Sequence, residues 1–425
     1  MPRLEPLHYQ NLDKRVEGMA YIPEARNNRF LTFKRIHPRT LLSIFKFFVT
    51  PALLGKIIEN MDDDHFILNR RRNYIHRPSI TEIYMALAVM IRIQGIHNAP
   101  QESTKNRRPL TEAVEEARNH FQHLVPSTHM PGMDIMMKLI SLELFTSEYS
   151  EEISQNFQNL VFSMGSICAG DEKLFHYTGK TKDIRFVPSK PARIGLWFYE
   201  LAVPLSYGAQ YLLHTRLSLG KEGLPVSSIV KIWCNIIKSY PNDHPMLLFD
   251  SYYMDNTAKV VLEESGVSYL ASFNPHRFQV ITPLLEAEVK KEGEWACLYE
   301  PESHHSIVHY WSPNKSMGKK WVMGNACTKT RYPNQRGNVP LYDDYGKNYA
   351  ACDHYNRSLY EKSWPHKKGG RKRMGALGAQ QNFIFTCILV NTINAFNEME
   401  KRGHENFDYR RYCVDLADEL FRSTS

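Results

Sequence analysis

The sequence predicts an α/β fold with a flanking helical region, on three observations. Apolar residues recur at three- and four-residue spacing through residues 41–165, which is the pattern of packed helices. From Cys168 onward the apolar runs become extended, and they alternate with helical segments as far as about residue 275. At 425 residues the chain exceeds what one hydrophobic core usually serves, so we expect two or three structural units.

One helix start in the first region is explicit. Ser79 and Glu82 form a capping-box pattern ahead of the apolar run IYMALAVMI, and we expect Gly95 to end that helix. Residues 99–111 are polar and are expected to form a loop. A long apolar helix predicted over 377–401 would complete this helical region from near the C-terminus.

The elements after Cys168 follow the order strand, strand, strand, helix, strand, helix, strand. They are a short strand holding Asp171, IGLWFYELAV, AQYLLHTRLSL, a helix at 228–240, HPMLLF, a helix at 256–265 and VSYLASF, with the shorter run IRFV before the turn PSKPAR. This is the order of a ribonuclease H-like fold, in which the first and fourth strands are neighbours in the central sheet. Asp250 directly follows the fourth strand, so we expect its carboxylate to meet that of Asp171.

The remaining segments complete the predicted organisation. Strand-like pieces with turn signals in 276–337 read as an inserted β-rich domain, and residues 345–362 look helical and carry Asp353. The predicted units are a polar N-terminal tail (1–39), a helical domain (40–165, completed by 358–401), a ribonuclease H-like domain (166–275 and 338–357), the insertion domain (276–337) and a C-terminal tail (402–425).

Asp171, Asp250 and Asp353 are candidate metal ligands. Phosphodiester chemistry uses two cations about 3.5–4 Å apart, and Mg²⁺ prefers oxygen ligands and keeps several waters, so three carboxylates suffice. An apolar strand that ends in a carboxylate, as LLFD does, is where α/β folds bind ligands. The alternative for each aspartate taken alone is an ordinary surface or helix-capping residue.

Four short motifs along the chain indicate a family. GDEKL holds Asp171 and Glu172, FDSYY holds Asp250, and CDHYN holds Asp353 eight residues after Tyr345, while PSKPARIGL spans 188–196. Together with INAF near residue 393, these motifs resemble the piggyBac transposases and their domesticated relatives from about residue 40 to about residue 400. PSKPARIGL is similar to the family's Pro-x-Lys-Pro-x-Lys/Arg-x-Gly segment, with each position in place: Pro188, Lys190, Pro191, Arg193 and Gly195.

The resemblance implies a DDE/D-type transposase that cuts and pastes DNA. In that reaction a metal-activated water nicks the transposon end, the freed 3′-hydroxyl attacks the opposite strand to form a hairpin, and the opened end joins target DNA. The resemblance also implies two Mg²⁺ or Mn²⁺ ions held by Asp171, Asp250 and Asp353, TTAA target sites, and a homodimer that acts on paired ends. On this resemblance the ribonuclease H-like domain is catalytic and the helical domain serves dimerisation and DNA binding.

Two departures from the family pattern support other functions. Asn356 stands where members commonly place another Asp, so it would offer the metal a carbonyl oxygen without a charge. None of the seven cysteines forms a CxxC pair, so we expect no structural zinc and no cysteine-rich DNA reader. The alternatives are a domesticated protein that binds DNA or chromatin without cutting it, and a nuclease whose partner protein supplies end recognition.

Basic residues are the candidates for DNA contact. The formal net charge of +8 suits a polyanionic partner without proving one. Lys190 and Arg193 lie in a predicted turn near the carboxylates, where they could hold a phosphate, although Lys190 could instead brace the turn. HKKGGRKR (366–373) is typical of a phosphate-binding run or a nuclear import signal, the alternative being a solvated loop; its basic residues are Lys367, Lys368, Arg371, Lys372 and Arg373.

Other features argue against other classes of protein. His304, His305 and His309 lack the spacing of a metal site, and we expect them to lie at a polar strand edge. The aromatics of 276–337 are expected to pack a core rather than stack on bases. No GxSxG follows a strand and no GxxxxGK[ST] is present. The apolar stretches are shorter than the roughly 20 residues that span a bilayer. We therefore expect a soluble nuclear protein with no membrane partner.

Overall fold

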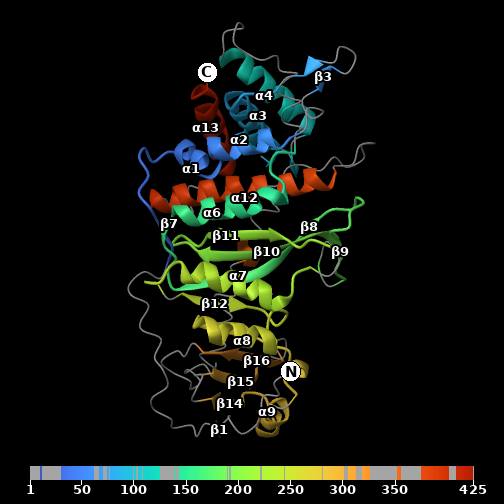
Figure 1. Ribbon diagram of the computed structural model, residues 1–425, viewed down its shortest axis with the longest axis vertical. Coiled ribbons are helices and arrows are strands. Elements are labelled where there is room, and N and C mark those ends of the chain that lie inside the picture. The colour runs from blue at the N-terminus through green and yellow to red at the C-terminus, as the bar shows by residue number, and fades with distance from the viewer. Residues whose placement is uncertain are drawn as a thin grey trace.

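The computed structural model describes most of the chain. The described residues are 10–11, 30–61, 67–69, 74–75, 77–98, 100–101, 104–107, 109–124, 139, 143–188, 190, 193–220, 223–243, 245–279, 281–300, 305–312, 318–325, 352–355, 375–401 and 408–424. Helices form one end of the molecule, a mixed sheet lies in the middle, and an antiparallel extension of that sheet forms the other end (Figure 1). The protein is thus an α/β structure with a flanking helical region, as predicted.

The helical end is built mainly from the first third of the chain. Its helices are α1 (Leu41–Phe48), α2 (Pro51–Glu59), α3 (Ile80–Asn98), α4 (Leu110–Leu124) and α6 (Ser150–Leu160), with a 3₁₀ turn at Ser147–Tyr149. Short antiparallel pairs accompany them: β2 (Thr32–Phe33) with β7 (Val161–Ser163), β3 (Ile67–Asn69) with β4 (Tyr74–Ile75), and β5 (Pro100–Gln101) with β6 (Thr104–Arg107). The last pair lies within residues 99–111, which the sequence predicts as a loop.

The start of α3 is as predicted and its end is not. Ser79 N–H donates to Glu82 Oε2 at 2.8 Å, and Glu82 N–H donates to Ser79 Oγ at 3.2 Å, which completes the capping box. The helix continues through Gly95 to Asn98. A Cβ at Gly95 would lie 2.7 Å from Cys413 Cβ. The glycine therefore permits close approach of another helix, which is why its presence does not end α3.

Five strands form the central part of the large sheet. They are β8 (Ile167–His176), β10 (Ile194–Pro204), β11 (Gln210–Leu217), β12 (Met246–Phe249) and β13 (Tyr269–Ser272), in the spatial order β13-β12-β8-β10-β11. Numbered along the chain, this is fifth, fourth, first, second, third. The predicted pairing of the first and fourth strands is confirmed, because β8 and β12 are parallel neighbours. The short strand β9 (Ile184–Phe186) pairs with the start of β10.

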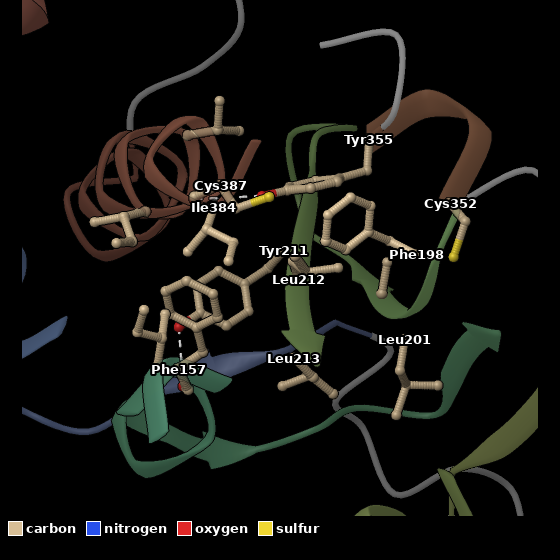
Figure 2. Packing of buried hydrophobic residues seen from close by; sticks show 14 of the residues in the cluster. Phe157, Phe198, Leu201, Tyr211, Leu212, Leu213, Cys352, Tyr355, Ile384 and Cys387 are labelled. Atoms are coloured by element: carbon tan, nitrogen blue, oxygen red, sulfur yellow. Dashed lines mark hydrogen bonds between the residues drawn. The ribbon is translucent and has the colours of Figure 1, made fainter. Parts of the chain in front are cut away.

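Helices cover both faces of this sheet (Figure 1). α7 (Val226–Lys238) and α8 (Asn256–Ser265) lie on one face, and α12 (Ala376–Met399) and α6 lie on the other. Phe198 of β10 stacks on Phe383 of α12 with ring centroids 3.9 Å apart, and Figure 2 shows Tyr211, Phe157 and Ile384 meeting in the same layer. This layer is the core on which the carboxylate-bearing elements rest.

The described residues of the predicted insertion domain (276–337) add antiparallel strands to the large sheet. They contain α9 (Thr282–Glu288), β14 (Trp295–Glu300), β15 (His305–Trp311) and β16 (Lys319–Gly324), after a 3₁₀ turn at Pro275–Arg277. β16 pairs antiparallel with β13, and β1 (Gln10–Asn11), from the predicted N-terminal tail, pairs with β14. The strand-like pieces WACLYE, SIVHYW and KWVMGNA thus fall on strands, as the sequence predicts.

The predicted C-terminal tail also differs from the structure. Residues 402–425 include α13 (Tyr409–Arg422), which Asp408 caps by accepting from Arg410 N–H at 3.0 Å. Its apolar side chains recur every three or four residues and are buried against α3 and α1: Tyr412, Cys413, Leu416, Leu420 and Phe421. The charged residues between them make the composition of this segment polar, and that composition is why a tail was predicted instead of an amphipathic helix.

No single described helix is both long and apolar enough to cross a membrane, and only α1 and α2 together, as a bent pair, pass that test of length and composition.

Candidate active site

Asp171 and Asp250 come together at adjacent strands. Phe249 at the end of β12 pairs with Gly170 of β8 in parallel register. Asp250 directly follows Phe249, and Asp171 directly follows Gly170. Asp171 is 4% exposed, and Asp250 is partly buried and accepts from Tyr252 N–H at 2.8 Å. The sheet therefore places these two predicted ligands side by side, as their positions in the sequence predict.

Asp353 lies on a short helical segment, residues 352–355, that docks beside β8. Cys352 is buried and its thiol donates to the carbonyl oxygen of Ala169 at 3.1 Å. Tyr355 is also buried, and its hydroxyl lies 3.3 Å from the Cys387 carbonyl oxygen and 3.2 Å from Asn391 Oδ1 (Figure 2). Asp353 itself is exposed between these two anchors. The third predicted carboxylate is thus carried on the face of β8 that α12 covers.

Glu172 lies close to Asp171 and Asp250, and its carboxylate makes two further contacts. It is 6% exposed, and its Oε2 accepts from the Tyr253 hydroxyl at 2.7 Å. Lys190 Nζ lies 3.1 Å from Glu172 Oε1, with the lysine side chain 33% exposed. Lys190, expected either to hold a phosphate or to brace the turn, is therefore ion-paired to Glu172. We refer to Asp171, Glu172, Asp250 and Asp353 as the carboxylate cluster.

The pKa shifts of Asp171, Asp250 and Lys190 show that these three side chains act on one another electrostatically. Burial, and then repulsion from Glu172 and Asp250, raises the pKa of Asp171 well above its usual range. Burial, and then repulsion from Glu172, raises the pKa of Asp250 to about 6. Burial alone would lower the pKa of Lys190, but attraction from Glu172, Asp171 and Asp353 outweighs it and raises that pKa. The excess of carboxylates over cations makes the cluster a site for positive charge.

The donor chemistry of the cluster fits a hard divalent cation better than zinc. Its candidate ligands are carboxylate oxygens, which Mg²⁺ and Mn²⁺ prefer. Burial raises the pKa of the nearby Cys352 thiol well above its usual value, which disfavours the thiolate that zinc would need. Within the residues that the structure describes, no three His, Cys, Asp or Glu side chains are arranged so that they could hold a metal ion.

The other predicted site residues are placed as follows. Arg193 is exposed, and its carbonyl oxygen accepts from Val187 N–H at 2.7 Å, which closes the predicted turn. Asn356 and the basic residues Lys367, Lys368, Arg371, Lys372 and Arg373 lie outside the described residues. His309 is buried, stacks on Trp321 with ring centroids 3.7 Å apart, and has its pKa lowered by burial. His309 is therefore buried in β15, between β14 and β16, and the polar strand edge predicted for it is wrong, because its ring packs on the aromatic side chain of the neighbouring strand.

Glu200 and Lys173 are near the site and were missed by sequence reasoning. Glu200 of β10 pairs directly with Asp171 of β8 and is 0% exposed. Burial lowers the pKa of Lys173, two residues after Asp171, and attraction from Glu200 opposes that effect. The signal available in the sequence was a single glutamate inside the otherwise apolar run IGLWFYELAV.

Structural comparison supplies a solved protein of similar fold. The chain matches the cryo-EM structure of a piggyBac transposase synaptic complex with hairpin DNA, at a TM-score of 0.62 and 14% sequence identity. The match covers 94% of this chain and 83% of the transposase chain. Sequence comparison matches no protein-family model and no curated protein. The likeness is one of fold, and it confirms at that level the resemblance that the motifs indicate: this chain folds as a piggyBac transposase does.

Proposed function

We propose that the protein is a transposase-like enzyme that cleaves and joins DNA strands at a site formed by Asp171, Asp250 and Asp353. The observation that carries the proposal is the placement of Asp171 and Asp250 on neighbouring parallel strands, inside a fold shared with a piggyBac transposase. The strand order β13-β12-β8-β10-β11 supports a ribonuclease H-like core for this site.

The side chains supply binding and orientation in this reaction. Two divalent cations, Mg²⁺ or Mn²⁺, would activate the attacking oxygen and stabilise the leaving oxygen. Asp171 and Asp250 would hold them from the sheet, and Asp353 would approach from the segment that Cys352 and Tyr355 anchor. Because Asp171 is buried, its carboxylate has little water to compete with a bound cation.

The family resemblance extends the proposal to partners and place. It suggests double-stranded DNA with TTAA target sites, a homodimer acting on paired ends, and a nuclear location. A partner protein that recognises the DNA ends is compatible with the same site. The neighbouring solved protein is described in a complex with hairpin DNA, which supports DNA as the substrate class here.

The decisive test replaces single carboxylates and measures Mg²⁺-dependent nicking of duplex DNA. Asp250→Asn and Asp171→Asn should each abolish nicking while the far-ultraviolet circular dichroism stays unchanged. Asp255→Asn is the matched control in the same loop, because Asp255 caps α8 by accepting from Ala258 N–H at 2.8 Å, and asparagine caps equally well. Nicking by Asp250→Asn at the wild-type rate would refute the assignment.

A second candidate function is DNA or chromatin binding without cleavage. It is favoured by the absence of a metal-ready trio among the described residues and by the Lys190 ammonium inside the cluster. Calorimetry with Mn²⁺ in the presence of DNA separates the two functions. Mn²⁺ binding that Asp171→Asn abolishes supports the enzyme, and no binding at millimolar Mn²⁺ supports the non-catalytic protein.

A further inference from the structure

The two oxygens of the Glu172 carboxylate are both engaged. Oε2 accepts from the Tyr253 hydroxyl at 2.7 Å, and Oε1 lies 3.1 Å from Lys190 Nζ. Tyr253 is fully buried, and its ring packs against Trp233 at a centroid distance of 4.8 Å. Glu172 is therefore fixed by the core and directs its second oxygen to the lysine, which makes it a poor candidate for a metal ligand despite its position next to Asp171.

Lys190 reaches this carboxylate from the segment between β9 and β10. Its own N–H donates to the Val187 carbonyl oxygen at 3.2 Å, and Val187 N–H donates to Arg193, so the backbone of the turn is closed. The side chain is 33% exposed, whereas Glu172 is almost fully buried. A long flexible stem with one end in water can leave the pair without disturbing the sheet.

The Lys190 ammonium also feels the other carboxylates of the site. Attraction from Asp171 and from Asp353 reinforces that from Glu172. Asp171 and Asp250 repel each other, and both are largely removed from water. A positive charge at this position therefore stabilises the cluster when it holds no divalent ion, and the same carboxylates are those assigned above as ligands.

We propose that Lys190 is a built-in counter-ion, positioned by Glu172 and Tyr253, that neutralises the carboxylate cluster and must be displaced when a divalent cation binds. The proposal rests on the proposed function, because it takes Asp171, Asp250 and Asp353 as the ligands. Its consequence is a reduced apparent affinity for metal, since the ion binds only the fraction of molecules from which the ammonium has moved. Metal entry is thereby coupled to movement of the Lys190 side chain away from Glu172.

The test is isothermal calorimetry with Mn²⁺ alone on the full chain. Lys190→Met and Lys190→Gln should each lower the Mn²⁺ dissociation constant about tenfold, and Lys190→Arg should leave it near the wild-type value because the charge is retained. Lys182→Met is the matched control, since Lys182 is exposed on the preceding loop. A purely structural role for Lys190 would change the urea midpoint without changing the affinity for metal.

The outcomes separate this inference from the proposed function. Wild-type binding of Mn²⁺ with an unchanged dissociation constant in both neutral variants overturns the counter-ion role and leaves the carboxylate site standing. An unchanged metal affinity with weaker duplex binding would identify Lys190 as a phosphate contact instead, which also overturns it. No Mn²⁺ binding to the wild type overturns the inference and the proposed function together.

Discussion

The Cys352 thiol donates to the carbonyl oxygen of Ala169 at 3.1 Å, two residues before Asp171 on the same strand. This contact ties the segment that carries Asp353 to the strand that carries the first carboxylate. Tyr355 fixes the other end of the segment to α12. Residues 352–355 and 167–176 are distant in sequence, so the position of Asp353 beside β8 depends on these two anchors.

Removal of the Tyr355 hydroxyl should weaken the site as well as the fold. Tyr355→Phe deletes contacts to the Cys387 carbonyl and Asn391 Oδ1, which should lower the free energy of unfolding by about 1–2 kcal/mol. It should also lower Mn²⁺ affinity, because Asp353 loses an anchor. Tyr211→Phe is the control: its buried hydroxyl donates to the Phe157 carbonyl at 2.9 Å, so urea unfolding should shift similarly with metal binding unchanged. Equal metal affinity in the two variants would contradict the anchoring role.

Gly170 should tolerate no side chain, because Trp233 of α7 lies directly against it. A Cβ there would meet Trp233 Cζ3 at 2.5 Å, so Gly170→Ala should destabilise the protein by about 1–3 kcal/mol through overpacking. Gly55→Ala is the matched control in helix α2, where a Cβ meets nothing within 4 Å. That change should stabilise by up to about 1 kcal/mol through helix propensity. Urea unfolding measures both, and a neutral Gly170→Ala would show that α7 does not press on β8.

The parts of the fold that were predictable are those set by local pattern and order. α8 was expected at 256–265 and is found at Asn256–Ser265, with Gly266 at a φ of 67° in the left-handed conformation that a helix end requires. The contact between β8 and β12 followed from the succession of strands and helices alone. Asp250 could be placed because an apolar strand delivers it to the edge of the sheet.

The parts that were not predictable depend on which elements meet in space. Gly95 has the same appearance in the sequence whether it ends a helix or faces Cys413 of α13. The sequence allows Lys190 either to hold a phosphate or to brace the turn, and only its three-dimensional placement beside Glu172 reveals its ion pair. The contact of Gly95 with Cys413 and that of Lys190 with Glu172 each join different elements of the fold. Periodicity and spacing in the sequence do not encode such contacts.

The docking of α13 can be tested through Asp418. Its Oδ1 lies 2.9 Å from Arg92 Nη1 of α3 and 2.8 Å from His120 Nε2 of α4. Asp418→Ala should lower the free energy of unfolding by about 2 kcal/mol, because it leaves the largely buried Arg92 without this carboxylate. Asp415→Ala on the same helix is the control, since Asp415 pairs with the exposed Arg411 at 3.8 Å and such exposed pairs contribute about 0–1 kcal/mol. Equal urea midpoints for the two variants would contradict the docking of this helix.

The basic run at 367–373 should contribute salt-dependent DNA affinity. Lys367→Gln with Lys368→Gln should weaken duplex binding and make the slope of log affinity against log salt shallower by up to about 2, because each phosphate contact contributes about 0.9 to that slope. Lys290→Gln with Lys291→Gln removes the same charge from exposed positions after α9 and should leave the slope unchanged. Fluorescence anisotropy between low and physiological salt measures both. If the two double variants share one slope, the run is solvated in the complex and the phosphates are held by other residues.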